Sequence, residues 1–267
     1  MRTAALLVTF ALFLSLGKAQ SHEFWINPLD YQVDDGHIVA SLRVGQEFDG
    51  VAASYLPRNF VRFDIIVGDA VSPVAGRMGD NPALDISGVP DGLAIIVHET
   101  TVNRLTYDEW DRFLGFAEHK DFPDIEARHD ARGLPREGFR ESYIRYAKSL
   151  VAVGNGEGND RIVGLLTEIV AGANPYTDEL DGSMPVQVFH DGAPRAGAQL
   201  ELFDRAPDGS VTITLYRADE TGQATLPVQP GHEYLVDAVT LIEDEASVED
   251  GPVWRSLWAS LTFSVPE

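Results

Sequence analysis

The stretch Leu257-Trp258-Ala259-Ser260-Leu261-Thr262-Phe263-Ser264-Val265 decides the fold class. Its odd-numbered residues are apolar, and three of its four even-numbered residues are small and polar. A period of two places one set of side chains in a core and the other on the opposite face of a strand. Similar short runs, separated by turns rich in Gly, Pro, Asp and Asn, fill residues 31–100 and 185–241. The sequence therefore predicts a mainly β protein built from sandwiches and not from a parallel sheet.

The length favours two domains, because 267 residues exceed one typical domain. We expect an N-terminal β-sandwich over residues 22–165 and a C-terminal one over residues 166–267. In the second half, Asp-Gly-x-Pro-x-x-Gly-Ala at 191–198 precedes an apolar run, a cadence that resembles prealbumin-like domains. The predicted architecture is thus two immunoglobulin- or prealbumin-like sandwiches.

A helical insertion is predicted inside the first sandwich, at about residues 106–150. Thr106 and Glu109 have the spacing of a capping box, and apolar residues follow at helical intervals. A second helix is expected over residues 137–150, because five residues there share one helical face: Phe139, Tyr143, Tyr146, Ala147 and Leu150.

Residues 1–21 have the pattern of a secretion signal. Arg2 precedes an apolar run at residues 4–16, which has the length of a signal-peptide core and is too short to span a membrane. Small residues permit cleavage after either Ala19 or Ser21. We expect a periplasmic or extracellular protein with no direct membrane insertion, since no later stretch is long and apolar enough for a span.

The charge balance restricts the class of partner. Asp and Glu number 42 against 20 Lys and Arg, giving a formal net charge of −22. Nucleic acids and anionic membranes would repel such a chain, whereas cations would be attracted. There is no cysteine, so neither a disulfide nor a lipoprotein anchor can form and each core must stabilise itself.

Four segments of the chain carry a family resemblance. They are SHEFWINPLDYQV at 21–33, RESYIRYAKSLVAVG at 140–154, NPYTDELDGSMPVQVFHDGAPRAGAQLELF at 174–203 and WRSLWASLTF at 254–263. Together they resemble a bacterial periplasmic family of unknown function, often described as the periplasmic component of nickel or cobalt uptake. The resemblance implies an exported protein that binds a transition-metal ion or its small chelate and that works with a membrane transporter component.

His22 is the residue on which a metal site depends. If the signal is cut after Ser21, the α-amine and the ring of His22 can chelate one ion, and nitrogen ligands suit Ni, Co, Cu or Zn. His98, His119 and His129 are the expected additional ligands. A plainer interpretation makes His22 the polar start of a strand, His98 a hydrogen-bonded, half-buried histidine and His119 with His129 part of a solvated acidic connector.

Enzymatic signatures are absent, so we do not expect an enzyme. The sequence has no His-Glu-x-x-His, no Gly-x-Ser-x-Gly, no phosphate-binding glycine loop and no cysteine nucleophile. A copper enzyme with a histidine brace at His22 is geometrically conceivable and is the third hypothesis. The second is an extracytoplasmic interaction or carbohydrate-binding module without a metal, which would use Trp110, Trp254 and Trp258 if these side chains faced solvent.

Overall fold

The computed structural model describes residues 22–244 and 251–267. The predicted signal peptide at residues 1–21 lies outside the described residues. Among the helices that are described, none combines the length and apolar character needed to cross a bilayer.

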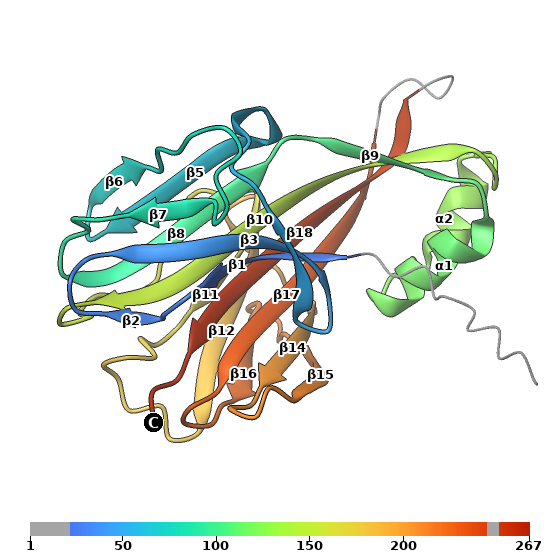
Figure 1. Ribbon diagram of the computed structural model, residues 1–267. Coiled ribbons are helices and arrows are strands. Elements are labelled where there is room, and N and C mark those ends of the chain that lie inside the picture. The colour runs from blue at the N-terminus through green and yellow to red at the C-terminus, as the bar shows by residue number, and fades with distance from the viewer. Residues whose placement is uncertain (1–21, 245–250) are drawn as a thin grey trace, which may run out of the picture.

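Three β-sheets form the body of the molecule (Figure 1). The central sheet has ten strands: β2 (Gln32–Val33), β5 (Phe60–Val67), β6 (Ala70–Pro73), β8 (Gly92–Thr100), β9 (Asn103–Tyr107), β10 (Phe139–Val153), β14 (Gln199–Arg205), β15 (Val211–Arg217), β17 (Glu233–Glu243) and β18 (Pro252–Ser264). The N-terminal sheet has β1 (Glu23–Pro28), β3 (Ile38–Gln46), β4 (Asp49–Ala53) and β7 (Leu84–Ile86). The C-terminal sheet has β11 (Thr167–Ala171), β12 (Ser183–His190), β13 (Ala193–Pro194) and β16 (Gln223–Pro227).

The central sheet runs through both halves of the chain. Its main order is β15-β14-β17-β18-β10-β8-β5-β6, and β2 and β9 also pair with β10. The two halves meet where β10 and β18 pair in parallel, with Ile144 beside Leu257. The two sandwiches expected from the sequence therefore share one sheet.

Two apolar cores lie on the two faces of this shared sheet. In β8, Ala94 and Ile96 pack against the N-terminal sheet in a core with Phe24 and Ile26. Their neighbours Leu93, Ile95 and Val97 face the C-terminal sheet in a second core. Since β8 and the second half of β10 are buried on both faces, these segments lack the alternation of a half-exposed strand.

The helical insertion is shorter than expected. It contains α1 (Trp110–His119) and α2 (Ile125–Ala131); the only other described helix is the 3-10 turn η1 (Pro57–Asn59). Figure 1 shows α1 and α2 at one end of the molecule, beside the long strands. Phe113 of α1 and Ile125 of α2 are fully buried in a third core, together with Trp254 and Trp258 of β18.

The helix predicted over residues 137–150 is wrong, because this segment is the long strand β10. The second half of this strand is buried on both faces, so its apolar residues do not alternate and happen to match a helical spacing. The capping box at Thr106 is also wrong. Thr106 belongs to β9, where it pairs with Arg140, and α1 begins only at Trp110.

The fold class is confirmed as mainly β. The short apolar runs expected within residues 185–241 correspond to β12, β14, β15, β16 and β17, and the alternating stretch that begins at Leu257 lies in β18. Each of these segments is bounded by the Gly- or Pro-containing turns that marked it in the sequence, apart from the boundary at the undescribed residues 245–250.

Candidate functional site

A buried charged cluster joins four separate segments of the chain. Lys120 directly follows α1, Glu23 begins β1, and Glu201 and Asp237 lie on the neighbouring strands β14 and β17. Glu201 and Asp237 are cross-strand partners in the antiparallel register, so their carboxylates lie side by side. We call these four residues, with His119 at their rim, the Lys120 cluster.

The ammonium group of Lys120 sits among the three carboxylates. Its Nζ lies 2.9 Å from Asp237 Oδ2, 3.1 Å from Glu201 Oε2 and 3.3 Å from Glu23 Oε1. All four residues are buried. Oxygen atoms of the three acids lie close enough together to hold a metal ion, but Lys120 takes the position that the cation would need.

Burial and charge compete in setting the protonation of this cluster. Burial raises the pKa of Glu23 to about 7, against the attraction of Lys120. Burial also raises the pKa of Asp237. Burial alone would lower the pKa of Lys120, but Asp237, Glu201 and Glu23 together raise it, so the ammonium stays charged. Burial would also raise the pKa of Glu201, but His119 and Lys120 together lower it. Glu23 is thus the carboxyl group of the cluster whose pKa lies near neutral pH.

His119 forms the accessible rim of the cluster. Its side chain is 49% exposed, and its Nε2 lies 3.0 Å from Glu201 Oε1. The contact with Glu201 raises the pKa of His119, although burial opposes this. Gln199 Nε2 donates to the carbonyl of His119 at 2.8 Å, which fixes the end of α1 against β14. Within the described residues, Nδ1 of His119 has no partner.

The structure places His22 near the same cluster through its chain neighbour. His22 is exposed, and the next residue, Glu23, contacts Lys120, which follows His119. The backbone carbonyl of His22 accepts a hydrogen bond from Arg145 Nη2 at 3.0 Å. The residue that follows His22 and the residue that follows His119 therefore form an ion pair with each other.

His98 lies apart from the Lys120 cluster, in the core under the N-terminal sheet. It is 3% exposed and packs among the rings of Phe24, Phe60 and Phe63. Burial lowers its pKa to about 3, so the ring is neutral, and its Nδ1 has no hydrogen-bond partner.

His129 has both ring nitrogens engaged. Trp254 Nε1 donates to its Nδ1 at 3.0 Å, and its Nε2 lies 3.0 Å from the carbonyl of Pro135, to which it donates. Its ring is buried against Trp110 and Phe139, and burial lowers its pKa. No ring nitrogen is left to bind a metal in this arrangement.

The tryptophans proposed for a ligand-binding surface are mostly interior. Trp254 is fully buried and Trp258 is 3% exposed. Trp110 is partly exposed, but the guanidinium of Arg136 covers its ring at 4.7 Å from the centroid. These positions remove two of the three aromatic side chains on which a carbohydrate-binding surface would depend.

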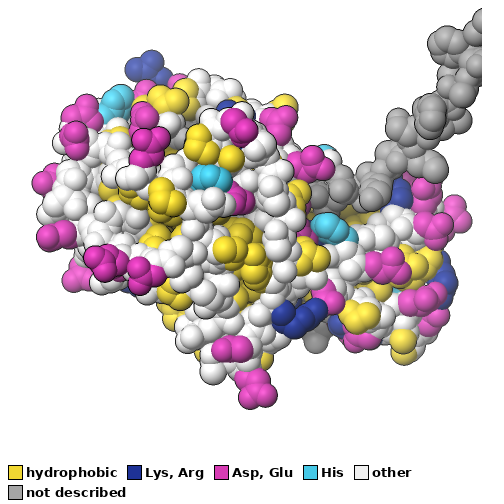
Figure 2. All heavy atoms as spheres, turned by 90° about the horizontal axis from the view of Figure 1, so that it is seen from below, with side chains coloured by type: hydrophobic (Ala, Val, Ile, Leu, Met, Phe, Trp, Pro, Cys, Tyr) yellow, Lys and Arg dark blue, Asp and Glu magenta, His cyan; other side chains and the backbone are white. Residues whose placement is uncertain are grey.

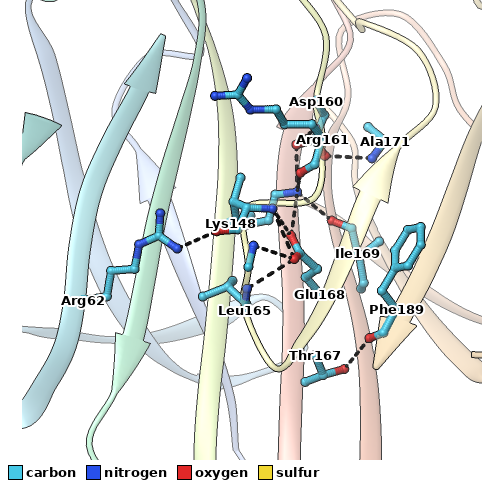
Figure 3. A network of polar contacts seen from close by, with 12 residues as sticks. Arg62, Lys148, Asp160, Arg161, Leu165, Thr167, Glu168, Ile169, Ala171 and Phe189 are labelled. Carbon is cyan, nitrogen blue, oxygen red and sulfur yellow. Dashed lines mark hydrogen bonds and ion pairs between the residues drawn. The ribbon is translucent and has the colours of Figure 1, made fainter. Parts of the chain in front are cut away.

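A second buried lysine forms a different kind of network, which we call the Lys148 network (Figure 3). Lys148 Nζ, on β10, lies 2.7 Å from Asp160 Oδ1 and donates to the carbonyls of Arg161 and Ile169. Glu168 accepts from three consecutive backbone amides, those of residues 163–165. This network holds the segment before β11 against β10. Every charged group in it has a partner.

Sequence reasoning did not single out Lys120, Glu23, Glu201 or Asp237. The available signal was a lone acid inside an apolar strand, as in Leu-Glu-Leu at 200–202 and Val-Asp-Ala at 236–238. Charged residues are almost never fully buried unless they are paired, so such positions predict buried partners. The partner itself, at the end of a helix about 80 residues earlier, has no signal in the sequence.

Solved structures offer only distant likeness. The chain resembles "Crystal structure of tetra-tandem repeat in extending region of large adhesion protein", with 11% identity, a TM-score of 0.21, and coverage of 92% of this chain and 49% of that chain. It also resembles "D0-D1 domain of Intimin", with 13% identity, a TM-score of 0.21, and coverage of 90% and 97%. The chain thus spans about half the length of the first of these structures.

No curated protein matches the chain. A family described as a domain of unknown function, DUF4198, matches over residues 19–241, which is most of the chain and contains every residue of the Lys120 cluster. The chain belongs to the DUF4198 family.

Proposed function

We propose that this protein is an exported periplasmic binding protein for a transition-metal ion of the nickel or cobalt type, or for its small chelate, in uptake or homeostasis. His22 and His119 are the proposed ligands. His98 is left out because aromatic rings enclose it, and His129 because both of its ring nitrogens are engaged.

The contact between His119 and Glu201 carries the proposal. Histidines that bind metals usually donate their other ring N–H to a carboxylate, which fixes the tautomer and the orientation of the ring. Glu201 Oε1 lies 3.0 Å from Nε2 of His119, close enough for this role although the two atoms are not aligned as a hydrogen bond, and Glu201 Oε2 is itself held by Lys120. With Nε2 facing Glu201, Nδ1 of the half-exposed His119 ring is the nitrogen whose lone pair can bind an ion.

The rest of the Lys120 cluster would support the ligand without binding the ion. The centre among Glu23, Glu201 and Asp237 is filled by the ammonium of Lys120, so the carboxylates do not fit a metal directly. They fit the role of an outer layer that orients His119 and offsets positive charge at the rim. Figure 2 shows acidic side chains spread over the visible face, which agrees with a surface that attracts cations.

Calorimetric titration of the metal-stripped chain starting at His22 tests the proposal. Ni(II), Co(II), Cu(II) and Zn(II) are titrated separately, and at least one should bind. His119→Ala should weaken binding, and Glu201→Gln should weaken it by about 10- to 100-fold, the range found for outer carboxylates. Binding should also weaken at acid pH, because protons compete for both imidazoles.

Two matched controls sharpen the result. His37→Ala removes an exposed histidine that pairs with Asp85, far in the fold from α1, and should leave affinity unchanged. A chain that starts at Gln20 keeps the His22 ring but removes the free amine next to it, so a loss of affinity would assign the amine as a ligand. Absence of binding heat with all four metals would contradict the proposal.

A further inference from the structure

Strand β15 forms one edge of the central sheet and is open to solvent. It pairs with β14 in unbroken register over its seven residues, and no strand lies on its other side among the described residues. Its residues 212–215 are all exposed; Ile213 is 42% and Leu215 is 53% exposed.

The backbone groups that face outward can be assigned. Just beyond the two ends of β15, Ala218 N donates to Ala198 O and Ala206 N donates to Ser210 O. Even-numbered residues of this hairpin are therefore the hydrogen-bonded pairs, since antiparallel pairs alternate along a ladder. The N–H and C=O groups of Val211, Ile213, Leu215 and Arg217 consequently point away from β14.

This edge lacks the usual protection against pairing. Natural edges carry charges, prolines or bulges, or they are short. The sequence of β15, Val-Thr-Ile-Thr-Leu-Tyr-Arg, has a single charge at its end and no proline or glycine. The opposite edge strand, β6, is four residues long and ends in Pro73, so it is protected.

We propose that β15 pairs with β15 of a second copy of this chain, joining two central sheets in an antiparallel, two-fold dimer. The register centred on Thr214 places Val211 opposite Arg217 of the copy and Ile213 opposite Leu215 of the copy. All four outward-facing residues of each strand then gain backbone partners. No like charges meet in this ladder, although the chain as a whole carries −22.

A single added cysteine tests the register, since the chain contains none. In the proposed dimer the two Thr214 residues form a non-hydrogen-bonded pair with Cα atoms about 4.5 Å apart, which is suitable for a disulfide. Thr214→Cys should therefore crosslink under mild oxidation at least about tenfold faster than Thr212→Cys, whose thiols would lie about 13 Å apart.

Light scattering after size-exclusion chromatography tests the dimer itself. The wild-type mass should rise towards twice the monomer mass as concentration increases. Leu215→Lys should keep the chain monomeric, and Val71→Lys on β6 is the matched control, because Leu215 and Val71 are each 53% exposed. A wild-type chain that stays monomeric at every concentration, or equal crosslinking of the two cysteine variants, would overturn the proposal. Neither readout depends on metal binding.

Discussion

Lys120 and Lys148 are both buried ammonium groups, but their partners differ in kind. Lys148 is held by Asp160, by backbone carbonyls and, at 3.6 Å, by Glu168, which also accepts hydrogen bonds from backbone amides. Lys120 instead faces three carboxylates from three strands. A buried charge whose partners are mostly backbone groups has a structural role. Where buried acids outnumber the base, the protonation of the carboxyl groups can change with pH or with a nearby ion.

Removing Lys148 should have the largest effect. Lys148→Met leaves the carboxylates of Asp160 and Glu168 buried without their cation, and breaking a buried pair in this way costs about 3–5 kcal/mol. Urea denaturation measures the free energy of unfolding. If the Lys148 network is purely structural, the loss of unfolding free energy should be similar at pH 6 and pH 8. A loss under 1 kcal/mol would contradict this structural role.

Removing Lys120 should cost about 3 kcal/mol at pH 8, because three buried carboxylates lose their counter-ion. The loss should be smaller at pH 5.5, since burial favours the protonated acids once Lys120 is gone. The same denaturation experiment with Lys120→Met at both pH values gives this difference. Equal losses at the two values would remove the distinction between the two lysines.

Glu23 should make stability depend on pH near neutrality. Its pKa is about 7 in the folded chain against an ordinary 4.5, so its contribution is complete below pH 4.5 and is lost as pH rises through 7. Glu23→Gln cannot ionise and should flatten this decline by about 1–3 kcal/mol between pH 4.5 and 7.5.

Glu141 is the matched comparison for this slope. Burial raises its pKa to about 7 as well, although Ser256 and Tyr107 donate hydrogen bonds to it. Glu141→Gln should remove a separate part of the decline. If the wild-type slope is unchanged in both variants, neither carboxyl titrates in this range in the folded chain.

The smallest effect should come from the polar contact at the rim. Gln199→Ala removes one exposed hydrogen bond to the carbonyl of His119 and should cost about 0.5–1 kcal/mol. Thermal denaturation should detect only a small shift, with no change in its dependence on pH. A larger loss would show that the end of α1 is held mainly by this contact.

Local pattern predicted the half-exposed and outer strands well. The run at 211–217 alternates and is bounded by turns, and it forms β15 as expected. The pattern failed at β10, because a strand covered on both faces has no polar side to reveal its period. The first helix was located within the insertion, but its starting point was wrong, since Thr106 is used in the ladder with β10. The second helix, expected over residues 137–150, is part of β10 instead.

The candidate site was only partly visible in the sequence. His119 and His22 were selected by residue type and position, and the fold links them through Glu23 and Lys120. That link depends on β1, β14 and β17 meeting at the end of α1, which is a tertiary arrangement. His98 and His129 have the same chemistry in the sequence, and only their packing distinguishes them.

The parallel pairing of β18 with β10 has a consequence for folding kinetics. β18 is the last strand of the chain, yet it lies in the middle of the central sheet and contacts a strand more than 100 residues earlier. The core that faces the C-terminal sheet and the core around α1 and α2 both contain side chains of β18, so neither can close until this strand has arrived. Such distant pairings are slow to form. These two cores should therefore form only after β18 has been synthesised, and removing β18 should prevent both of them from forming.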